Sequence, residues 1–326
     1  MFEIIRHDIQ FDFMAKRKLW AGLSVLFIVV TFILLFTKGL NYGIDFRGGA
    51  EVQIKAPATW DIGKVRNALS DGGLKNFKVQ QIGVPTDSQY LVKTEGDEST
   101  MNAVKETVDG ILKKEVQAGE TYRIEKTDVV GAAAGASLRM SGILSMLYAL
   151  ICILIYVAIR FDARYAPGAV LALFHDTVIV VGVFILTQKQ FDLQILAAIL
   201  ALIGYSNNDT IIVFDRIREE LHANPSMNIV AVVNKSINET LGRTVLTSLS
   251  TFLTVFSLWI FGGKALEDFA FTLMVGIIVG TYSSVFIASS LVVFITEYQQ
   301  KRQVAAKSGG KQRKSYQVRP DPKFTA

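Results

Sequence analysis

Residues 191–219 read FDLQILAAILALIGYSNNDTIIVFDRIRE, an apolar stretch with polar side chains in its second half and a charged segment behind it. A helix that crosses a membrane needs about 20 mostly apolar residues, because the hydrocarbon core is about 30 Å thick and a helix rises about 1.5 Å per residue. The stretch from Phe191 to Phe214 meets this length. We therefore expect a transmembrane helix here, whose polar segment faces protein or water rather than lipid.

Five other apolar stretches pass the same test. Hydrophobic residues make up 51% of the 326 residues, yet 34 basic and 29 acidic side chains are also present, so the apolar residues must be gathered in blocks. The first stretch lacks a small-residue cleavage site behind it, which favours an anchor over a cleaved signal. The five predicted spans are Leu19–Phe36, Leu138–Ile159, Pro167–Thr187, Thr244–Phe261 and Phe269–Thr296.

The distribution of basic residues predicts the orientation. Short cytoplasmic segments are rich in Lys and Arg. On one side of the membrane the loops carry only Lys189 and Lys264, whereas basic residues gather on the other side. We therefore expect both termini in the cytoplasm and the long segment between the first two spans outside. The basic positions on the cytoplasmic side are Arg6, Lys16, Arg17, Lys18, Arg160, Arg164, Arg216, Arg218, Lys235 and Arg243, followed by the basic tail.

The outer segment of about 100 residues alternates runs of period two, typical of strands, with runs of period near 3.6, typical of helices. The predicted order is βαββαβ, which matches an α+β ferredoxin-like sandwich with two helices on one face of an antiparallel sheet. The expected elements are strands at Ala50–Ala56, Phe77–Val84, Gln89–Thr94 and Thr121–Val130, and helices at Thr59–Leu69, with Thr59 as the cap candidate, and Ser99–Val116.

Small residues mark two places where helices are expected to approach closely. The segment 131–145 reads GAAAGASLRMSGILS, and Gly276 and Gly280 lie four residues apart in the last span. Small residues allow close helix contacts in lipid. Packing within the chain is the favoured interpretation, and an interface with a partner is the alternative.

Ionisable residues at membrane depth cost about 2.5 to 3.5 kcal/mol each on insertion scales, so each suggests a function. Asp176 lies in the third span and Asp209 in the polar segment of the fourth. The carboxylate and its polar neighbours suit binding and release of H⁺ or Na⁺, and these neighbours are Ser206, Asn207, Asn208 and Thr210. A purely structural polar network is the alternative.

Arg243 and His175 are the charged neighbours to consider. Arg243 begins the fifth span and, if close to Asp209, would hold that carboxylate ionised until a proton separates the pair. Equally, it could be an anchor at the membrane surface. His175 precedes Asp176 and forms with it either a relay or a structural pair, of which the structural pair is slightly favoured.

Several classes of activity are disfavoured. Asp176 and Asp209 could in principle form an intramembrane aspartyl protease, but the YD and GxGD motifs of such proteases do not surround them. No GxxxxGK[ST] sequence for nucleotide binding occurs. Cys152 is the only cysteine and there are three histidines, so neither an internal disulfide nor a cysteine metal cluster is expected. We expect no enzyme activity, no cofactor and no metal.

Four motifs together carry a family resemblance. They are GIDFRGG at 43–49, GYSNNDTIIVFDRIRE at 204–219, GRTVLTS at 242–248 and FGG at 261–263. In this order they resemble the SecD/SecF family of protein-export membrane proteins, within the resistance-nodulation-division superfamily. The likeness covers nearly the whole chain. Asn207 and the GAAAG segment at 131–135 depart from the usual family pattern.

The resemblance implies a function in the bacterial inner membrane. Family members of this kind pair with SecD beside the SecYEG channel, with YajC and SecA as further partners, and use the proton or sodium gradient to help draw preproteins out on the periplasmic side. It implies that Asp209 and Arg243 are the ion-coupling residues. It also implies that the motif with Gly43, Asp45, Gly48 and Gly49 begins the periplasmic domain, where the glycines permit tight turns.

The expected organisation follows from these observations. It comprises a cytoplasmic N-terminus at 1–18, a transmembrane helix at 19–37, the periplasmic domain at 38–137, five transmembrane helices at 138–298 and a tail at 299–326. The tail is basic and poor in apolar residues, which predicts disorder and attraction to anionic lipid rather than to nucleic acid. Two other functions stay open: a small-molecule exporter of the same superfamily, and a scaffold for SecD and the channel that is not coupled to ions.

Overall fold

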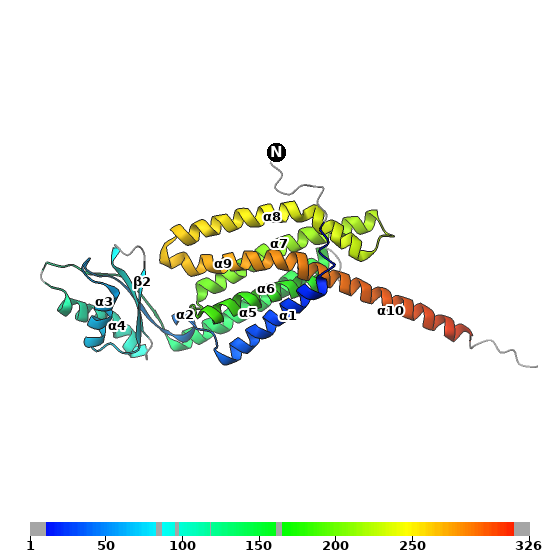
Figure 1. The fold of residues 1–326 in the computed structure, drawn as a ribbon. Helices are drawn as coiled ribbons and strands as arrows, with labels where there is room; N and C mark the ends of the chain where they lie inside the picture. Colours follow the sequence, from blue (N-terminus) through cyan, green and yellow to red (C-terminus); the bar gives the residue numbers. More distant parts are fainter. Residues whose placement is uncertain (1–10, 83–86, 95–97, 118, 161–164, 316–326) are drawn as a thin grey trace, which may run out of the picture.

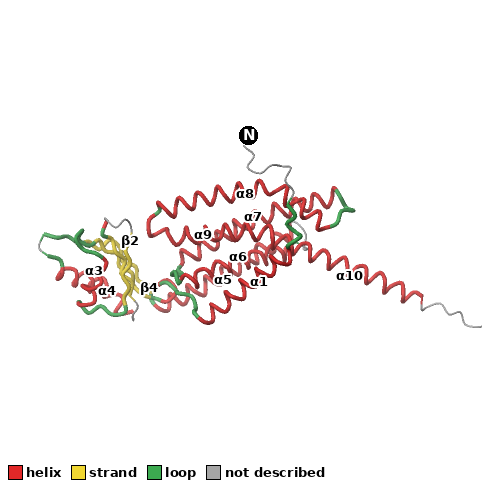
Figure 2. Tube along the Cα trace, viewed as in Figure 1, coloured by secondary structure: helices red, strands yellow, loops and turns green. Residues whose placement is uncertain are grey.

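The computed structural model describes residues 11–82, 87–94, 98–117, 119–160 and 165–315. Within these residues, six helical segments are long and apolar enough to cross a membrane, as predicted. They form a bundle, and a small domain with a sheet lies beyond one end of it (Figures 1 and 2). The first five are α1 (Arg17–Thr37), α5 (Ala132–Arg160), α6 (Ala166–Thr187), α7 (Leu193–Ala223) and α8 (Ile229–Phe261).

The sixth span is a composite of three segments. Helix α9 (Gly263–Ser283) is followed by a π-helical turn, η2 (Ser284–Ala288), and by α10 (Ser289–Ser315). Ser289 Oγ donates to the carbonyl of Ser284, five residues earlier, at 3.0 Å. Such π-helical turns inside α-helices frequently lie near functional sites.

Two helices are longer than their apolar stretches predict. Helix α8 begins at Ile229, well before the predicted start at Thr244, and α7 continues past Phe214 to Ala223. Hydropathy detects only the apolar part of a helix, whereas capping residues determine where it begins. Asn228 caps α8 by accepting a hydrogen bond from Val230 N at 2.8 Å.

The tail differs from the prediction of disorder from residue 299. Helix α10 continues to Ser315 and extends away from the bundle at the end opposite the sheet (Figure 1). The segment is rich in Lys, Arg, Gln and Ala, which favour helix and prolong one already begun in the buried part. The ends of the two predicted terminal segments, 1–10 and 316–326, lie outside the described residues.

The small domain between α1 and α5, which we call the outer domain after its expected location, contains a four-stranded antiparallel sheet in the order β2-β3-β1-β4. The chain order of strands and helices is βαββαβ, as the sequence predicts. Strand β3 has the predicted bounds, while β2 is described only to Ile82 and residues 83–86 lie outside the described part. The strands are β1 (Gly49–Lys55), β2 (Phe77–Ile82), β3 (Gln89–Thr94) and β4 (Arg123–Val130).

Helices α3 (Ile62–Asp71) and α4 (Glu98–Glu115) cover one face of this sheet (Figure 2). The buried face of β1 consists of Ala50, Val52 and Ile54, which alternate with polar residues as the strand period requires. The cap predicted at Thr59 is wrong by two residues: Asp61 accepts the hydrogen bond from Lys64 N at 2.7 Å. Threonine and aspartate both cap helices, so the sequence alone did not decide between Thr59 and Asp61.

A short helix was not predicted. Helix α2 (Ile44–Arg47) lies inside the GIDFRGG motif, between α1 and β1. Gly48 and Gly49 follow it with φ of +82° and +155°, in the region that favours glycine. Gly43 has φ of −71°, so the turn predicted for it does not require a glycine conformation; its lack of a side chain serves close packing instead.

Candidate functional site

The polar segment of α7 presents one face to the interior of the bundle. Ser206, Asn207, Asp209 and Thr210 are buried, whereas Asn208 is exposed. A helix turns about 100° per residue, so positions three and four apart share a face and position 208 points elsewhere. The predicted role of Asn208 in a relay therefore lacks support from its position, and Asn207 takes the interior place.

Asp209 is buried between three helices, with 2% of its surface exposed. Ser248 of α8 donates from Oγ to Asp209 Oδ2 at 3.4 Å, and Thr281 of α9 donates to Ser248 Oγ at 2.8 Å. The carboxylate is thereby connected to both neighbouring helices through hydroxyl groups. Thr281 was not singled out from the sequence, although the polar run TYSS at 281–284 inside an apolar helix was a signal for it.

Asp176 has closer partners than Asp209. Its Oδ2 accepts from Ser206 Oγ of α7 at 2.6 Å, and its Oδ1 lies 3.0 Å from Nδ1 of His175. Both Asp176 and His175 are buried to 2% exposure on α6. The structure thus joins three of the predicted residues, His175, Asp176 and Ser206, in one polar cluster that connects α6 to α7.

Both carboxylates are linked to one face of α7: Asp209 lies on this face, and Asp176 of α6 accepts a hydrogen bond from Ser206 on it. Ser206 and Asp209 are three residues apart on the same face of α7. Gly280 of α9 packs against this face, since a Cβ atom there would lie 2.9 Å from Ser206 Oγ. Gly276 similarly packs against Leu202, which confirms that this glycine pair serves contacts within the chain.

Several buried polar atoms near this face have no hydrogen-bond partner among the described protein atoms. Leaving such a group unsatisfied costs about 1 to 3 kcal/mol, so a cluster of them inside a bundle favours a site that binds protons, ions or water. These atoms are His175 Nε2, Tyr205 OH, Asn207 Oδ1, Thr210 Oγ1 and Thr244 Oγ1.

Two placements were expected for Arg243, a pair with the Asp209 carboxylate and an anchor at the membrane surface. Within the described part of the chain it forms no ion pair with Asp209, and its side chain is exposed. Thr244 and Ser248 occupy the face of α8 that is buried toward α7. Arg243 precedes Thr244 by one residue and is therefore turned about 100° away from that face.

The GIDFRGG motif lies at the outer end of the bundle, against the loop that precedes α7. Asp45 accepts a hydrogen bond from Leu193 N at 3.0 Å, and a Cβ atom on Gly43 would lie 3.0 Å from Cβ of Asp192. Gly48 packs against the start of α5, where a Cβ atom would meet Cα of Ala132 at 2.7 Å. Gly43 and Asp45 thus contact the start of α7 and Gly48 contacts the start of α5, whereas Gly49 packs against Thr94 of β3 and Ile44 of α2.

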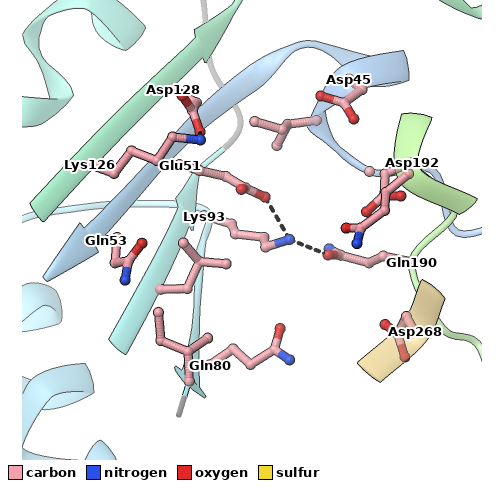
Figure 3. Close-up of a pocket in the computed structure, with 15 residues that line it drawn as sticks. Asp45, Glu51, Gln53, Gln80, Lys93, Lys126, Asp128, Gln190, Asp192 and Asp268 are labelled. Carbon is pink, nitrogen blue, oxygen red and sulfur yellow. Dashed lines mark hydrogen bonds and ion pairs between the residues drawn. The ribbon is translucent and has the colours of Figure 1, made fainter. Parts of the chain in front are cut away.

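A cavity of about 280 Å³ separates the outer sheet from the membrane helices (Figure 3). Lys93 of β3 crosses it and contacts Glu51 of β1 and Gln190, which precedes α7. Burial raises the pKa of the Asp192 carboxyl, and the nearby Asp45 carboxylate adds to this effect. The polar face of the sheet therefore lies toward the ends of the bundle helices.

The comparisons with known proteins decide the family. A family model described as protein export membrane protein SecD/SecF, C-terminal, matches residues 111–298, which is more than half of the chain. The chain belongs to the SecD/SecF family. A second model, the SecD/SecF GG motif, matches residues 33–56 and includes the GIDFRGG motif.

Relatives in this family are similar over almost their whole length. A protein translocase subunit SecF from Calditerrivibrio nitroreducens is 45% identical over 301 residues, which cover 92% of this chain and 98% of the relative. Another, from Magnetococcus marinus, is 40% identical and covers 91% and 96%. These names describe transport rather than catalysis.

Solved SecDF structures are similar to this fold. The crystal structure of SecDF from Thermus thermophilus, described as a translocon-associated membrane protein, matches with a TM-score of 0.77 and 34% identity over 90% of this chain. SecDF in its super-membrane-facing form matches with a TM-score of 0.68. The chain spans about two fifths of those SecDF chains. Membership in the SecD/SecF family, with six apolar helices, makes this a multi-pass membrane protein and supports an accessory role in Sec protein translocation.

Proposed function

We propose that this chain acts with SecD beside the SecYEG channel and uses the proton or sodium gradient to assist the periplasmic stage of protein export. The observation that carries the proposal is Asp209, a buried carboxylate at membrane depth whose one side-chain hydrogen bond among the described residues is the long one from Ser248 at 3.4 Å. A carboxylate has about four acceptor positions, so Asp209 retains capacity to take up a proton or a cation.

The coupling would act through α7, α8 and α9. When Asp209 is ionised, it attracts donors and cations; when it is protonated, it becomes a donor itself and loses that attraction. Ser248 and Thr281 connect the carboxylate to α8 and α9, so a change in its charge alters the contacts of both helices. This is a two-state element that an ion gradient can bias.

Arg243 retains a place in this proposal. The guanidinium is exposed in the described arrangement, but turning α8 by about 100° would bring its position to the face that Thr244 now occupies. Ionised Asp209 favours such an approach, and protonated Asp209 does not. His175, Asp176 and Ser206 would then hold α6 and α7 together beside the ion path, while their alternative role is a relay.

The outer domain and the termini complete the proposal. The antiparallel order β2-β3-β1-β4 and the chain order βαββαβ support a ferredoxin-like domain, which we place at 38–137 in the periplasm of a bacterium. The short segments with many Lys and Arg support an inner-membrane orientation with both termini in the cytoplasm. The preprotein would contact the outer domain, the basic tail would contact lipid, and YajC and SecA are the further proposed partners.

The test is export of a secreted reporter in cells depleted of the native gene and complemented with wild type or Asp209→Asn. Asparagine has similar volume but no titratable group, so we expect normal assembly with SecD and loss of the gradient-dependent part of export. Glu219→Gln is the matched control, because Glu219 lies on the same helix with an exposed side chain. Normal gradient-dependent export by Asp209→Asn would instead support an uncoupled scaffold.

A further inference from the structure

The segment before β1 is joined to the loop before α7 by backbone hydrogen bonds. Phe191 N donates to Asn41 O at 2.8 Å, and Gly43 N donates to Phe191 O at 2.8 Å, which forms a short parallel bridge. The side chain of Asn41 donates to the carbonyl of Gln188 at 2.8 Å. These segments are far apart in sequence, and the bridge makes one unit of them, which we call the junction (residues 41–49 with 188–193).

Asp45 extends the junction to the first turn of α7. Its Oδ2 accepts from Leu193 N at 3.0 Å, while Asp192 Oδ1 accepts from Ile195 N at 3.0 Å. The first amides of a helix have no partner within the helix, and the positive end of the helix dipole attracts carboxylates. A residue from outside the helix therefore caps α7, and it does so from the segment that leads into the outer domain.

The junction has contacts within itself, with α5 and with the sheet of the outer domain. Phe46 of α2 stacks on Phe191 with ring centroids 6.0 Å apart. On the exit side, Gly135 of α5 packs against the backbone of Gly48, where a Cβ atom would lie 2.8 Å from Gly48 N. From the sheet, Lys93 donates to Gln190 across the cavity (Figure 3). A displacement at the start of α7 therefore reaches the sheet through the chain that enters β1 at Gly49 and through the contact of Lys93 with Gln190.

We propose that Asp45 is a positioning residue that couples α7 to the outer domain through its hydrogen bond with Leu193 N. The inference rests on the proposed function, because α7 also carries Ser206 and Asp209. Sixteen residues separate Leu193 from Asp209, which is about 24 Å along a helix. Such a helix transmits a shift of the Asp209 site to its capped end, and Asp45 passes the shift to α2 and β1.

The experiment measures movement of the outer domain. Spin labels at Lys38→Cys and Lys55→Cys, both exposed, report on the end of α1 and the end of β1 in a Cys152→Ser background. The full complex with SecD is placed in vesicles, and the distance distribution is recorded with and without an imposed H⁺ or Na⁺ gradient. The change that the gradient causes in the wild-type distance distribution is the reference for the variants.

Two variants remove the same hydrogen bond from opposite sides. Asp45→Ala removes the acceptor, and Leu193→Pro removes the donor at the first position of α7, where proline suits the helix and Asp192 is already extended. Asp45→Asn keeps an acceptor oxygen and should restore the response. Asp61→Ala, which removes the cap of α3 within the outer domain, controls for loss of a cap elsewhere.

We expect Asp45→Ala and Leu193→Pro to reduce about fivefold the fraction of molecules that adopt the label distance induced by the gradient, as loss of one capping hydrogen bond implies. Asp45→Asn and Asp61→Ala should respond as wild type does. If wild type responds and both junction variants respond equally well, the inference is wrong while the proposed function stands. If wild type itself shows no response to either gradient, the proposed function fails and the inference fails with it.

Discussion

Asp209 and Asp176 are two buried carboxylates with different surroundings. Asp176 lies between Ser206 at 2.6 Å and His175 at 3.0 Å, whereas Asp209 has Ser248 at 3.4 Å. A carboxylate held by close partners is stabilised in one state, and one with a single long hydrogen bond is freer to exchange its proton or cation. This difference assigns the structural role to Asp176 and the coupling role to Asp209 in our proposal.

A carboxylate outside the membrane offers a test of stability against pH. Glu120 accepts hydrogen bonds from Thr59 and, at 3.3 Å, from Trp60 Nε1. The Thr59 hydroxyl is the main cause that lowers the pKa of Glu120 below its ordinary value of 4.5. A group whose pKa is lowered by folding stabilises the domain above its ordinary pKa, and this contribution is lost as pH falls through the lower, folded value.

Glu120→Gln should therefore lower the urea midpoint of the outer domain at pH 7, and the difference from wild type should shrink as pH falls below 4.5 and vanish once the pH lies below the lowered pKa of Glu120. Trp60 fluorescence reports this unfolding in a Trp20→Phe, Trp259→Phe background. Glu115→Gln, on the exposed face of α4, is the matched control and should leave the midpoint unchanged. An equal difference between wild type and Glu120→Gln at every pH would contradict the account.

The positions of single side chains were the least predictable part of the site. The sequence identified Asp209, Asp176 and Ser206 because polar residues are rare in an apolar span. It did not place Asn208 on an exposed face, since a shift of one residue changes a helix face by about 100°, and it left Arg243 open between a pair with Asp209 and an exposed anchor. Thr281 was missed because hydroxyl side chains are common in membrane helices. Only its hydrogen bond to Ser248 shows that it belongs to the site.

At the scale of elements, close contacts between backbones connect the outer domain to the bundle. Gly135 on α5 approaches the backbone of Phe46, Arg47 and Gly48, and Gly48 in turn approaches the backbone of Ala132 at the start of α5. Small residues allow such approaches, and the GAAAG departure at 131–135 fits this packing. The glycines of α5 are therefore part of the connection and not only of the span.

Gly135→Ala should destabilise the protein by about 1 to 3 kcal/mol, because the added Cβ atom meets a backbone atom that cannot move aside. Gly110→Ala is the matched control on α4, where a Cβ atom has nothing within 4 Å. That variant should be neutral or stabilising by up to about 1 kcal/mol, as alanine favours helix. Thermal unfolding of the purified protein measures both, and similar melting temperatures for the two variants would contradict this packing argument.

Strands and apolar helices were predictable because each has a simple period. The four strands lie within a few residues of their predicted bounds, since one face of the sheet is buried and alternates with a polar face. Helix α2, with four residues, was too short to give a period. The start of α8 was missed because residues 229–243 are amphipathic rather than apolar, and its cap Asn228 is the better signal.

In the whole molecule, burial differs between helices. In the most apolar parts of α6, α7 and the sixth span, about half of the residues are buried within the chain, against only 11% in α1 and α5 and 17% in α8. Large apolar side chains such as Phe36, Ile159 and Phe261 are highly exposed. Such faces suit lipid or a partner subunit. The arrangement places α6 and α7, with Asp176 and Asp209, at the centre of the chain.

The central claim is that Asp209 carries the coupled ion, and the most direct measurement is ion flux. The purified complex of this chain with SecD is reconstituted in vesicles that contain a pH-sensitive or a sodium-sensitive dye, and an H⁺ or Na⁺ gradient is imposed. We predict flux of one of these ions with wild type and with Glu219→Gln, and its loss with Asp209→Asn. Equal flux of that ion through Asp209→Asn and wild type would contradict the account.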